Sequence, residues 1–134
     1  MRRRWPLLLG AMVWLGGACT FAGGAPPGPP VEVLAEGERL YAQYCQTCHG
    51  DVRGEGRIPP APPHNETGHT WHHPDDQLRA IVLFGSPSGR MPAFQGRLTP
   101  EQVDAILAYI KTWWTEDQRR FQAQITERFR RGRR

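Results

Sequence analysis

Two cysteines with two residues between them, and a histidine directly after them, constrain this chain more than any other feature. The motif is Cys45-Gln46-Thr47-Cys48-His49. Residues three apart share a face of one helical turn, so both thiols can reach the two vinyl groups of a porphyrin. The motif is typical of covalent attachment of a c-type haem. We therefore predict Cys45 and Cys48 as the attachment points and His49 as an iron ligand.

Two other kinds of site use the same cysteine spacing. A thioredoxin-like dithiol follows a strand, whereas residues 33–44, just before the motif, have the pattern of a helix. A zinc site with Cys45, Cys48, His69 and His73 as ligands is the second alternative. The stretch between Cys48 and His69 is longer than a usual finger linker and contains four prolines in place of a hairpin. The sequence favours haem over both alternatives.

The first 24 residues have the pattern of an export signal. Arg2, Arg3 and Arg4 precede an apolar, uncharged run over residues 5–18, and small residues follow it. The run is short for a transmembrane helix. We expect residues 1–24 to be a signal peptide, with an uncleaved N-terminal anchor as the alternative. Residues 25–30 are mostly proline, which predicts a stiff linker.

Cys19 allows a third outcome for the leader. A lipoprotein signal is cut directly before a cysteine that then carries lipid. The small residues Gly17 and Ala18 fit that rule, while Leu15 lies one position too early. Lipid at Cys19 is therefore an alternative to cleavage farther along. In both cases Cys19 is not a disulfide partner of the two haem cysteines.

Helical patterns account for the rest of the chain, which is long enough for one domain. Residues 31–44 and 74–84, and a segment starting at Thr99, carry apolar side chains at helical spacing. Thr99 begins a capping-box sequence with proline in the first turn. Gly37 lies inside the first helix, where it costs about 1 kcal/mol relative to alanine, which suggests close approach of the last helix. We find no strand pattern and predict an all-α domain over residues 31–114.

The segment from Val31 to Trp114 resembles a class I cytochrome c domain. It carries the haem motif followed by Gly50, the run Gly37-Glu38-Arg39-Leu40-Tyr41 in the first helix and Ile106-Leu107-Ala108-Tyr109 in the last. The resemblance implies a small helical domain wrapped around one covalently bound haem c. It also implies an electron carrier and not an enzyme.

The resemblance assigns further residues to the haem. Residues 85–94 resemble the loop that delivers the sixth iron ligand, which makes Met91 that ligand; Met1 and Met12 lie in the leader. A thioether raises the reduction potential relative to two nitrogen ligands. In the family a proline carbonyl accepts the Nδ1 hydrogen of the haem histidine. Pro59 and Pro60 occupy the matching place, and we expect Pro59 to fill this role.

Four histidines gather in the segment from His64 to His73. Since family members commonly place Trp, Tyr or Arg near the haem propionates, we expect Trp71 and one or two of these histidines to bond them. Plain surface histidines and a second metal, such as copper, are the alternatives. A helical pairing of His69 with His73 is disfavoured by Pro74.

Charge divides the chain into an acidic domain and a basic tail. Residues 31–114 hold seven basic and ten acidic residues, whereas residues 115–134 hold seven arginines and three acids. Trp114, Phe121, Ile125 and Phe129 recur in and before the tail at helical spacing. We expect the last helix to continue into an amphipathic tail that lies on an anionic membrane, folds back over the protein, or stays solvated. A nucleic-acid partner is not expected, because export disfavours it.

Together these features predict an exported cytochrome with one haem that exchanges single electrons with respiratory or other redox partners. It would act in the periplasm or at the outer face of the cytoplasmic membrane. One alternative is a haem enzyme or sensor in which Met91 leaves the iron. The other is a metal-binding module built on the segment from His64 to His73.

Overall fold

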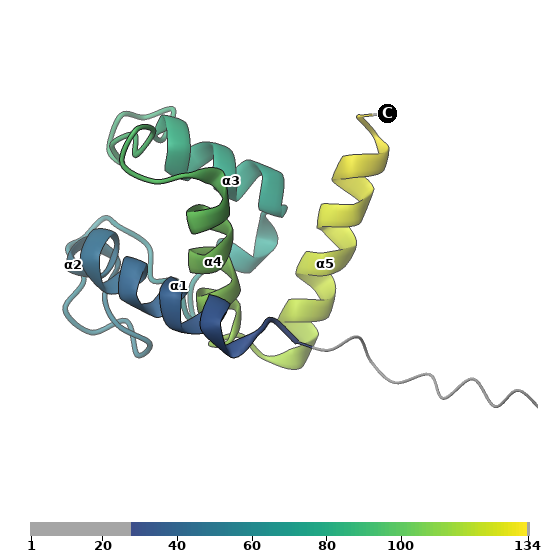
Figure 1. Ribbon diagram of the computed structural model, residues 1–134, viewed down its shortest axis with the longest axis horizontal. Coiled ribbons are helices and arrows are strands. Elements are labelled where there is room, and N and C mark those ends of the chain that lie inside the picture. The colour runs from purple at the N-terminus through teal and green to yellow at the C-terminus, as the bar shows by residue number, and fades with distance from the viewer. Residues whose placement is uncertain (1–27, 134) are drawn as a thin grey trace, which may run out of the picture.

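The computed structural model describes residues 28–133 of the chain. Within that range it is helical and holds no strand, so the all-α prediction is confirmed (Figure 1). The elements are α1 (Val31–Tyr44), α2 (Gln46–His49), the short 3-10 helix η1 (Thr70–His72), α3 (Asp75–Phe84), α4 (Pro100–Lys111) and α5 (Glu116–Arg131). The predictions for the leader and for Cys19 lie outside the described residues.

α1 crosses α4 at Gly37, where the two backbones touch. A Cβ atom at Gly37 would lie 2.1 Å from the carbonyl oxygen of Ala105, so no other residue fits without moving a helix. The predicted approach of the two helices at this glycine is confirmed. Around the crossing lies the apolar core, to which α3 and the loop after it also contribute. Its members are Leu40, Tyr41, Cys45, Leu78, Leu83, Phe94, Leu98, Val103, Ile106, Leu107, Ile110 and Trp114.

The start of α4 follows the predicted capping box. The Thr99 hydroxyl accepts the Gln102 backbone N–H at 3.2 Å, and the Gln102 side chain accepts the Thr99 N–H at 3.0 Å. The expected continuation of this helix into the tail is wrong. α4 ends at Lys111, and α5 begins with its own capping box at Thr115 and Gln118. Thr115 has an extended backbone that breaks the helix, because a residue in the cap position stands outside the helical dihedrals.

The buried face of α5 is polar. Gln122 and Thr126 are 2% and 5% exposed, whereas Phe121 and Phe129 on the neighbouring face are 43% and 36% exposed. The predicted apolar row thus buries Trp114 but leaves two of its aromatic rings at the surface. Figure 1 shows α5 standing along one side of the molecule, and it packs against η1.

No helix within residues 28–133 combines the length and the apolar character needed to cross a membrane.

Candidate haem site

The two motif cysteines lie on one helical turn. α1 ends at Tyr44, and Cys45 caps α2; the backbone N–H groups of Cys48 and His49 donate to the Cys45 carbonyl at 3.1 and 2.9 Å. Neither thiol is in a disulfide; Cys45 is buried and Cys48 is exposed. Burial raises the pKa of Cys45 to about 12, so its thiol keeps its proton. The turn thus presents two reduced thiols three residues apart.

A tight turn follows the motif at Gly50. Its φ is +80°, and a Cβ atom there would lie 2.7 Å from the Glu55 carbonyl oxygen, so glycine is required. The buried Tyr41 hydroxyl donates to the Gly50 carbonyl at 2.8 Å. Tyr41 therefore ties α1 to the chain directly after the haem motif.

His49 is held in one tautomer. Its Nδ1 lies 2.7 Å from the carbonyl oxygen of Pro62, which can only accept, so Nδ1 carries the hydrogen. The lone pair is then on Nε2, the atom available to a metal. Burial lowers the pKa of His49, against the opposing effect of the Pro62 bond, and thereby favours the neutral imidazole that binds iron.

The structure corrects the proline that was expected to orient His49. Pro62 fills that role, not Pro59. Ile58 donates to the Cys48 carbonyl at 2.9 Å, and a turn then closes with the Ala61 N–H on the Ile58 carbonyl at 3.0 Å. This turn carries Pro59 around its exposed outer side and returns Pro62 to the imidazole. The sequence, with four prolines in this stretch, holds no signal that selects among them.

The donor set of this turn fits a covalently bound haem. Two unpaired thiols on one face would form the thioether bonds, and a neutral imidazole with a free Nε2 would bind the iron. A dithiol enzyme has no need of the third group. A zinc site would need two more ligands, and residues 28–133 hold no cluster of three or more His, Cys, Asp or Glu side chains placed to bind a metal ion. The zinc alternative and the second-metal alternative therefore lack support in the described part of the chain.

Met91 lies in a loop that folds back on its own start. The Met91 N–H donates to the Ser86 hydroxyl at 3.0 Å, and the Ser86 N–H donates to the Met91 carbonyl at 3.1 Å. The side chain is partly buried against the apolar core. Gly85, at φ +84°, lets the chain turn here. The role of Met91 as iron ligand stays a prediction.

The four histidines between His64 and His73 make different ring contacts. His64 stacks on His49 with ring centroids 4.0 Å apart, and burial, with smaller effects of His49 and His69, lowers its pKa to about 3. His72 stacks on Trp71 at 3.5 Å, and His69 meets His73 edge to face at 5.6 Å. Only His64 thus contacts the predicted iron ligand.

Trp71 is partly buried against the core. Its indole N–H donates to the Gly68 carbonyl at 3.0 Å. Its contact with the haem propionates stays a prediction.

Sequence reasoning missed the polar residues that hold this region together. Asn65 is 5% exposed; its amide donates to the Val52 carbonyl at 3.0 Å and its oxygen accepts from Thr67. Gln122 and Thr126 on α5 bond to the segment around η1. A signal for the second pair existed, because Gln118, Gln122 and Thr126 recur at four-residue spacing. The apolar residues Phe121, Ile125 and Phe129 recur at the same spacing in the same helix, and this stronger pattern draws attention away from the polar one.

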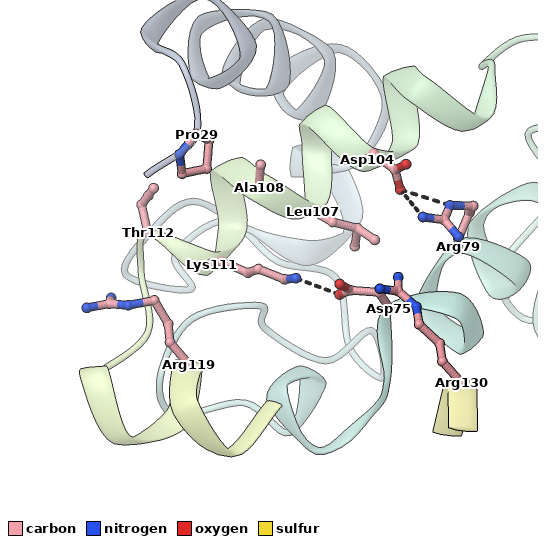
Figure 2. Close-up of a pocket in the computed structure, with 10 residues that line it drawn as sticks. All are labelled: Pro29, Asp75, Arg79, Asp104, Leu107, Ala108, Lys111, Thr112, Arg119 and Arg130. Carbon is pink, nitrogen blue, oxygen red and sulfur yellow. Dashed lines mark hydrogen bonds and ion pairs between the residues drawn. The ribbon is translucent and has the colours of Figure 1, made fainter. Parts of the chain in front are cut away.

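A hollow of about 600 Å³ lies between α3, α4 and α5, apart from the haem motif. Figure 2 shows Lys111 pointing toward Asp75, at 2.6 Å, and Arg79 toward Asp104, also at 2.6 Å. Arg119 and Arg130 also line the hollow, and Arg130 pairs with Asp76 at 2.8 Å. None of its lining residues belongs to the motif. The hollow is a junction of three helices.

The chain is similar in sequence to a known protein family and to several known proteins. Residues 32–110 match the family described as cytochrome c oxidase, cbb3-type, subunit III. The chain is 35% identical over 97 residues to dihydro-heme d1 dehydrogenase of Pseudomonas aeruginosa, covering 67% of this chain and 19% of that protein.

Two further relatives are named as an oxidase subunit and a cytochrome. The cbb3-type cytochrome c oxidase subunit FixP of Bradyrhizobium diazoefficiens is 34% identical over 77 residues, or 57% of this chain and 26% of the relative. Cytochrome c-L of Methylorubrum extorquens is 29% identical over 85 residues, or 61% of this chain and 41% of the relative. The chain thus spans less than half the length of these curated relatives.

Proposed function

Because the chain belongs to this family of cytochrome c domains, and its cofactor is therefore covalently bound haem c, we propose that it carries single electrons between redox partner proteins. The observation that carries the proposal is the 2.7 Å contact of His49 Nδ1 with the Pro62 carbonyl. It leaves Nε2 as the iron-binding atom, on the same turn as two reduced thiols.

Each motif residue has a defined task under this proposal. The thiols of Cys45 and Cys48 would add across two vinyl groups of the haem: sulfur would bond to one carbon and hydrogen would go to the other, so no oxidant is needed. His49 would hold the iron through Nε2, and Met91 would hold it through its thioether sulfur. When bound, haem c supplies a one-electron iron couple. Two protein ligands leave no open position for a substrate, so the function is electron transfer and not catalysis.

Motif variants test the attachment. The holoprotein and the double variant Cys45→Ala/Cys48→Ala are compared on denaturing gels stained for haem. We expect a haem-stained band for the wild type and none for the variant. Covalent haem in the double variant would refute the assignment of the attachment points.

A matched pair of variants tests the electron-carrier function. Met91→Leu keeps the apolar volume but removes the sulfur, and Met91→Ala removes both. Both variants should keep covalent haem, lose the long-wavelength methionine–iron band, gain carbon monoxide binding and show a lower midpoint potential. If Met91→Leu keeps the wild-type spectrum and potential, Met91 is not the ligand. A wild-type protein that already binds carbon monoxide would instead favour the haem sensor or enzyme.

We propose further that the protein is exported and meets redox partners outside the cytoplasm. The support is the leader pattern of residues 1–24 and the proline-rich linker of residues 25–30. The partner proteins would be components of electron-transfer complexes, as the name of the FixP relative indicates for that protein.

The end of α5, with Arg133 just after it, forms a basic surface that we propose as a contact for a membrane. Phe129 is 36% exposed, and the Arg133 guanidinium lies 5.5 Å from the centre of its ring. Arg128 is exposed beside it. An aromatic ring with arginines beside it suits the interface of an anionic membrane. We propose that this end of α5 rests on such a surface.

A further inference from the structure

Four side chains in and just before α5 form one row that bonds to the backbone of the segment from His64 to His73, called the histidine segment below, and of Asp75 at the start of α3. They recur at every fourth position, so within the helix they share a face. This row, called the α5 polar row below, consists of Trp114, Gln118, Gln122 and Thr126. Their partners are the His64 carbonyl at 2.8 Å, the Glu66 carbonyl at 2.9 Å, the His73 carbonyl at 3.2 Å and the Asp75 N–H at 3.1 Å, in that order.

Three of the four side chains in the α5 polar row are buried. Trp114, Gln122 and Thr126 are 3%, 2% and 5% exposed. The Gln122 amide also reaches the Asp75 carboxylate at 2.7 Å, which in turn binds Lys111. A buried polar group that loses its partner keeps the full cost of its lost hydration, which disfavours any arrangement that strands it. These contacts therefore fix one position of the segment and not a range of positions.

His64, the first residue of the segment that the row holds, packs on His49, the predicted iron ligand. His64 stacks on His49 with ring centroids 4.0 Å apart and planes 27° apart. Its Nδ1 lies 2.8 Å from the hydroxyl of Thr70, the first residue of η1. Trp114 holds the His64 backbone directly, and Gln122 holds the far end of η1. Movement of the row would therefore move the ring that covers His49.

We infer that the α5 polar row is a set of positioning residues for the haem iron: it holds His64 against the imidazole of His49 and so sets the environment of that predicted ligand. The inference rests on the proposed electron-transfer function. Burial and hydrogen bonding around an axial ligand are two of the means by which a protein sets a haem potential. If the segment loosens, water approaches His49 and stabilises the more highly charged ferric state. The midpoint potential should then fall.

Variants at Thr126 give the sharpest test, because they separate the hydroxyl from the volume. Thr126→Val keeps the shape and removes the acceptor for the Asp75 N–H, whereas Thr126→Ser keeps the hydroxyl. Gln122→Ala, with Gln124→Ala as control, forms a second pair. Gln124 is an exposed glutamine on the same helix. Midpoint potential is measured on each holoprotein, and hydrogen exchange is measured at the His72 and His73 amides.

We expect Thr126→Val and Gln122→Ala to lower the potential and to speed exchange about fivefold, the factor for one net hydrogen bond. Thr126→Ser and Gln124→Ala should match the wild type, and covalent haem should be retained throughout. If amide exchange speeds up while the midpoint potential stays constant, the row stabilises the segment but does not affect the iron, and the inference is rejected. If neither the exchange rate nor the potential changes, the row does not hold the segment, and the inference is rejected as well.

The same experiment separates this inference from the proposed function. A wild-type chain without covalent haem would sink the proposed function, and the exchange rates would still show whether the row holds the segment. Should Gln122→Ala fail to fold, the two Thr126 variants decide the question alone.

Discussion

At the scale of single residues, Tyr41 connects the helix crossing to the haem motif. Its ring packs edge to face on Trp113 with centroids 4.9 Å apart, and its hydroxyl reaches the Gly50 carbonyl. Burial raises its pKa well above the ordinary value, so the hydroxyl stays a donor at any physiological pH. One side chain thus anchors both the core and the turn that follows His49.

Removing this hydroxyl should cost stability without removing haem. Tyr41→Phe leaves the Gly50 carbonyl without its side-chain donor, and we expect a loss of about 1–2 kcal/mol in the free energy of unfolding. The matched control is Tyr109→Phe, whose hydroxyl makes a longer, exposed contact of 3.4 Å with Glu38. Urea unfolding of the two holoproteins checks this. Equal losses in both variants would show that the Gly50 bond adds nothing special.

Residue roles could be predicted where the signal is local. The spacing of Cys45, Cys48 and His49 is chemical information in itself, and the structure places the three on one helical turn. The choice of Pro62 over Pro59 depends on a turn that closes at Ala61, and nothing in the local sequence sets where the chain returns. For the same reason His64, which stacks on His49 from fifteen residues away, could not be singled out among the histidines.

At the scale of helices, the contact of α1 with α4 depends on Gly37, which has no side chain. Gly37→Ala would place a Cβ atom 2.1 Å from backbone of Ala105, so the helices must separate. Overpacking of this kind costs about 1–3 kcal/mol, and more when backbone must move. Gly28→Ala is the control, because open space surrounds that position. Thermal unfolding that leaves Gly37→Ala as stable as Gly28→Ala would contradict the tight crossing.

The junction of α3 with α5 should respond to acid. A hydrogen bond from Arg130 is the main cause that holds the pKa of Asp76 below its ordinary 3.8. A carboxyl with a lowered folded pKa contributes stability above its unfolded pKa and loses that contribution as the pH falls through the folded value. The pair is partly exposed, so its contribution is about 0.2–1 kcal/mol.

Asparagine variants test this junction. Asp76→Asn should be less stable than the wild type at pH 7, and the difference should shrink only below the ordinary 3.8, as the pH falls through the lowered folded pKa of Asp76. Asp117→Asn is the control, since Asp117 pairs with Arg120 inside α5. Urea unfolding over a pH series from neutral into strong acid gives the comparison. A difference that stays unchanged through the most acidic point of the series would show that the charge of Asp76 is not its source.

Helices could be predicted from the sequence where their signals lie within a few residues. The bounds of α1 and the capping box at Thr99 are of this kind. α5 shows the limit, because its apolar row of Phe121, Ile125 and Phe129 does not mark the face that packs on the protein. Gln122 and Thr126 are buried instead, since the surface that α5 meets offers backbone carbonyls and an N–H, not an apolar groove. That surface exists only after the histidine segment has folded.

At the scale of the whole molecule, charge separates along the chain. The domain of residues 31–114 is acidic overall, and the tail of residues 115–134 is basic. Part of the tail's charge is neutralised within the fold, because Arg130 binds Asp76 and Arg131 binds Glu127. Arg128 and Arg133 are exposed near the end of α5 and add positive charge there. An anionic surface would therefore attract this end of the helix.

Vesicle co-sedimentation checks the membrane proposal. Arg128→Gln/Arg133→Gln should weaken binding to anionic vesicles by about 2 kcal/mol, or roughly 30-fold in the partition coefficient. Wild-type binding should fade between 0.1 and 1 M salt, as the Debye length drops from about 10 Å to about 3 Å. Arg90→Gln/Arg97→Gln, with two exposed arginines of the domain, is the control. Equal binding of both double variants would reject the end of α5 as the contact.

The four-residue spacing of the α5 polar row makes that helix far more sensitive to insertion than to substitution. Each helical residue turns the chain by about 100°, so one alanine inserted after Ala123 would swing Thr126 away from Asp75 while leaving Gln122 in place. Replacing exposed residues such as Ala123 or Gln124 leaves the phase intact. The length of α5 between its contacts is therefore fixed, although its outer surface is free to vary.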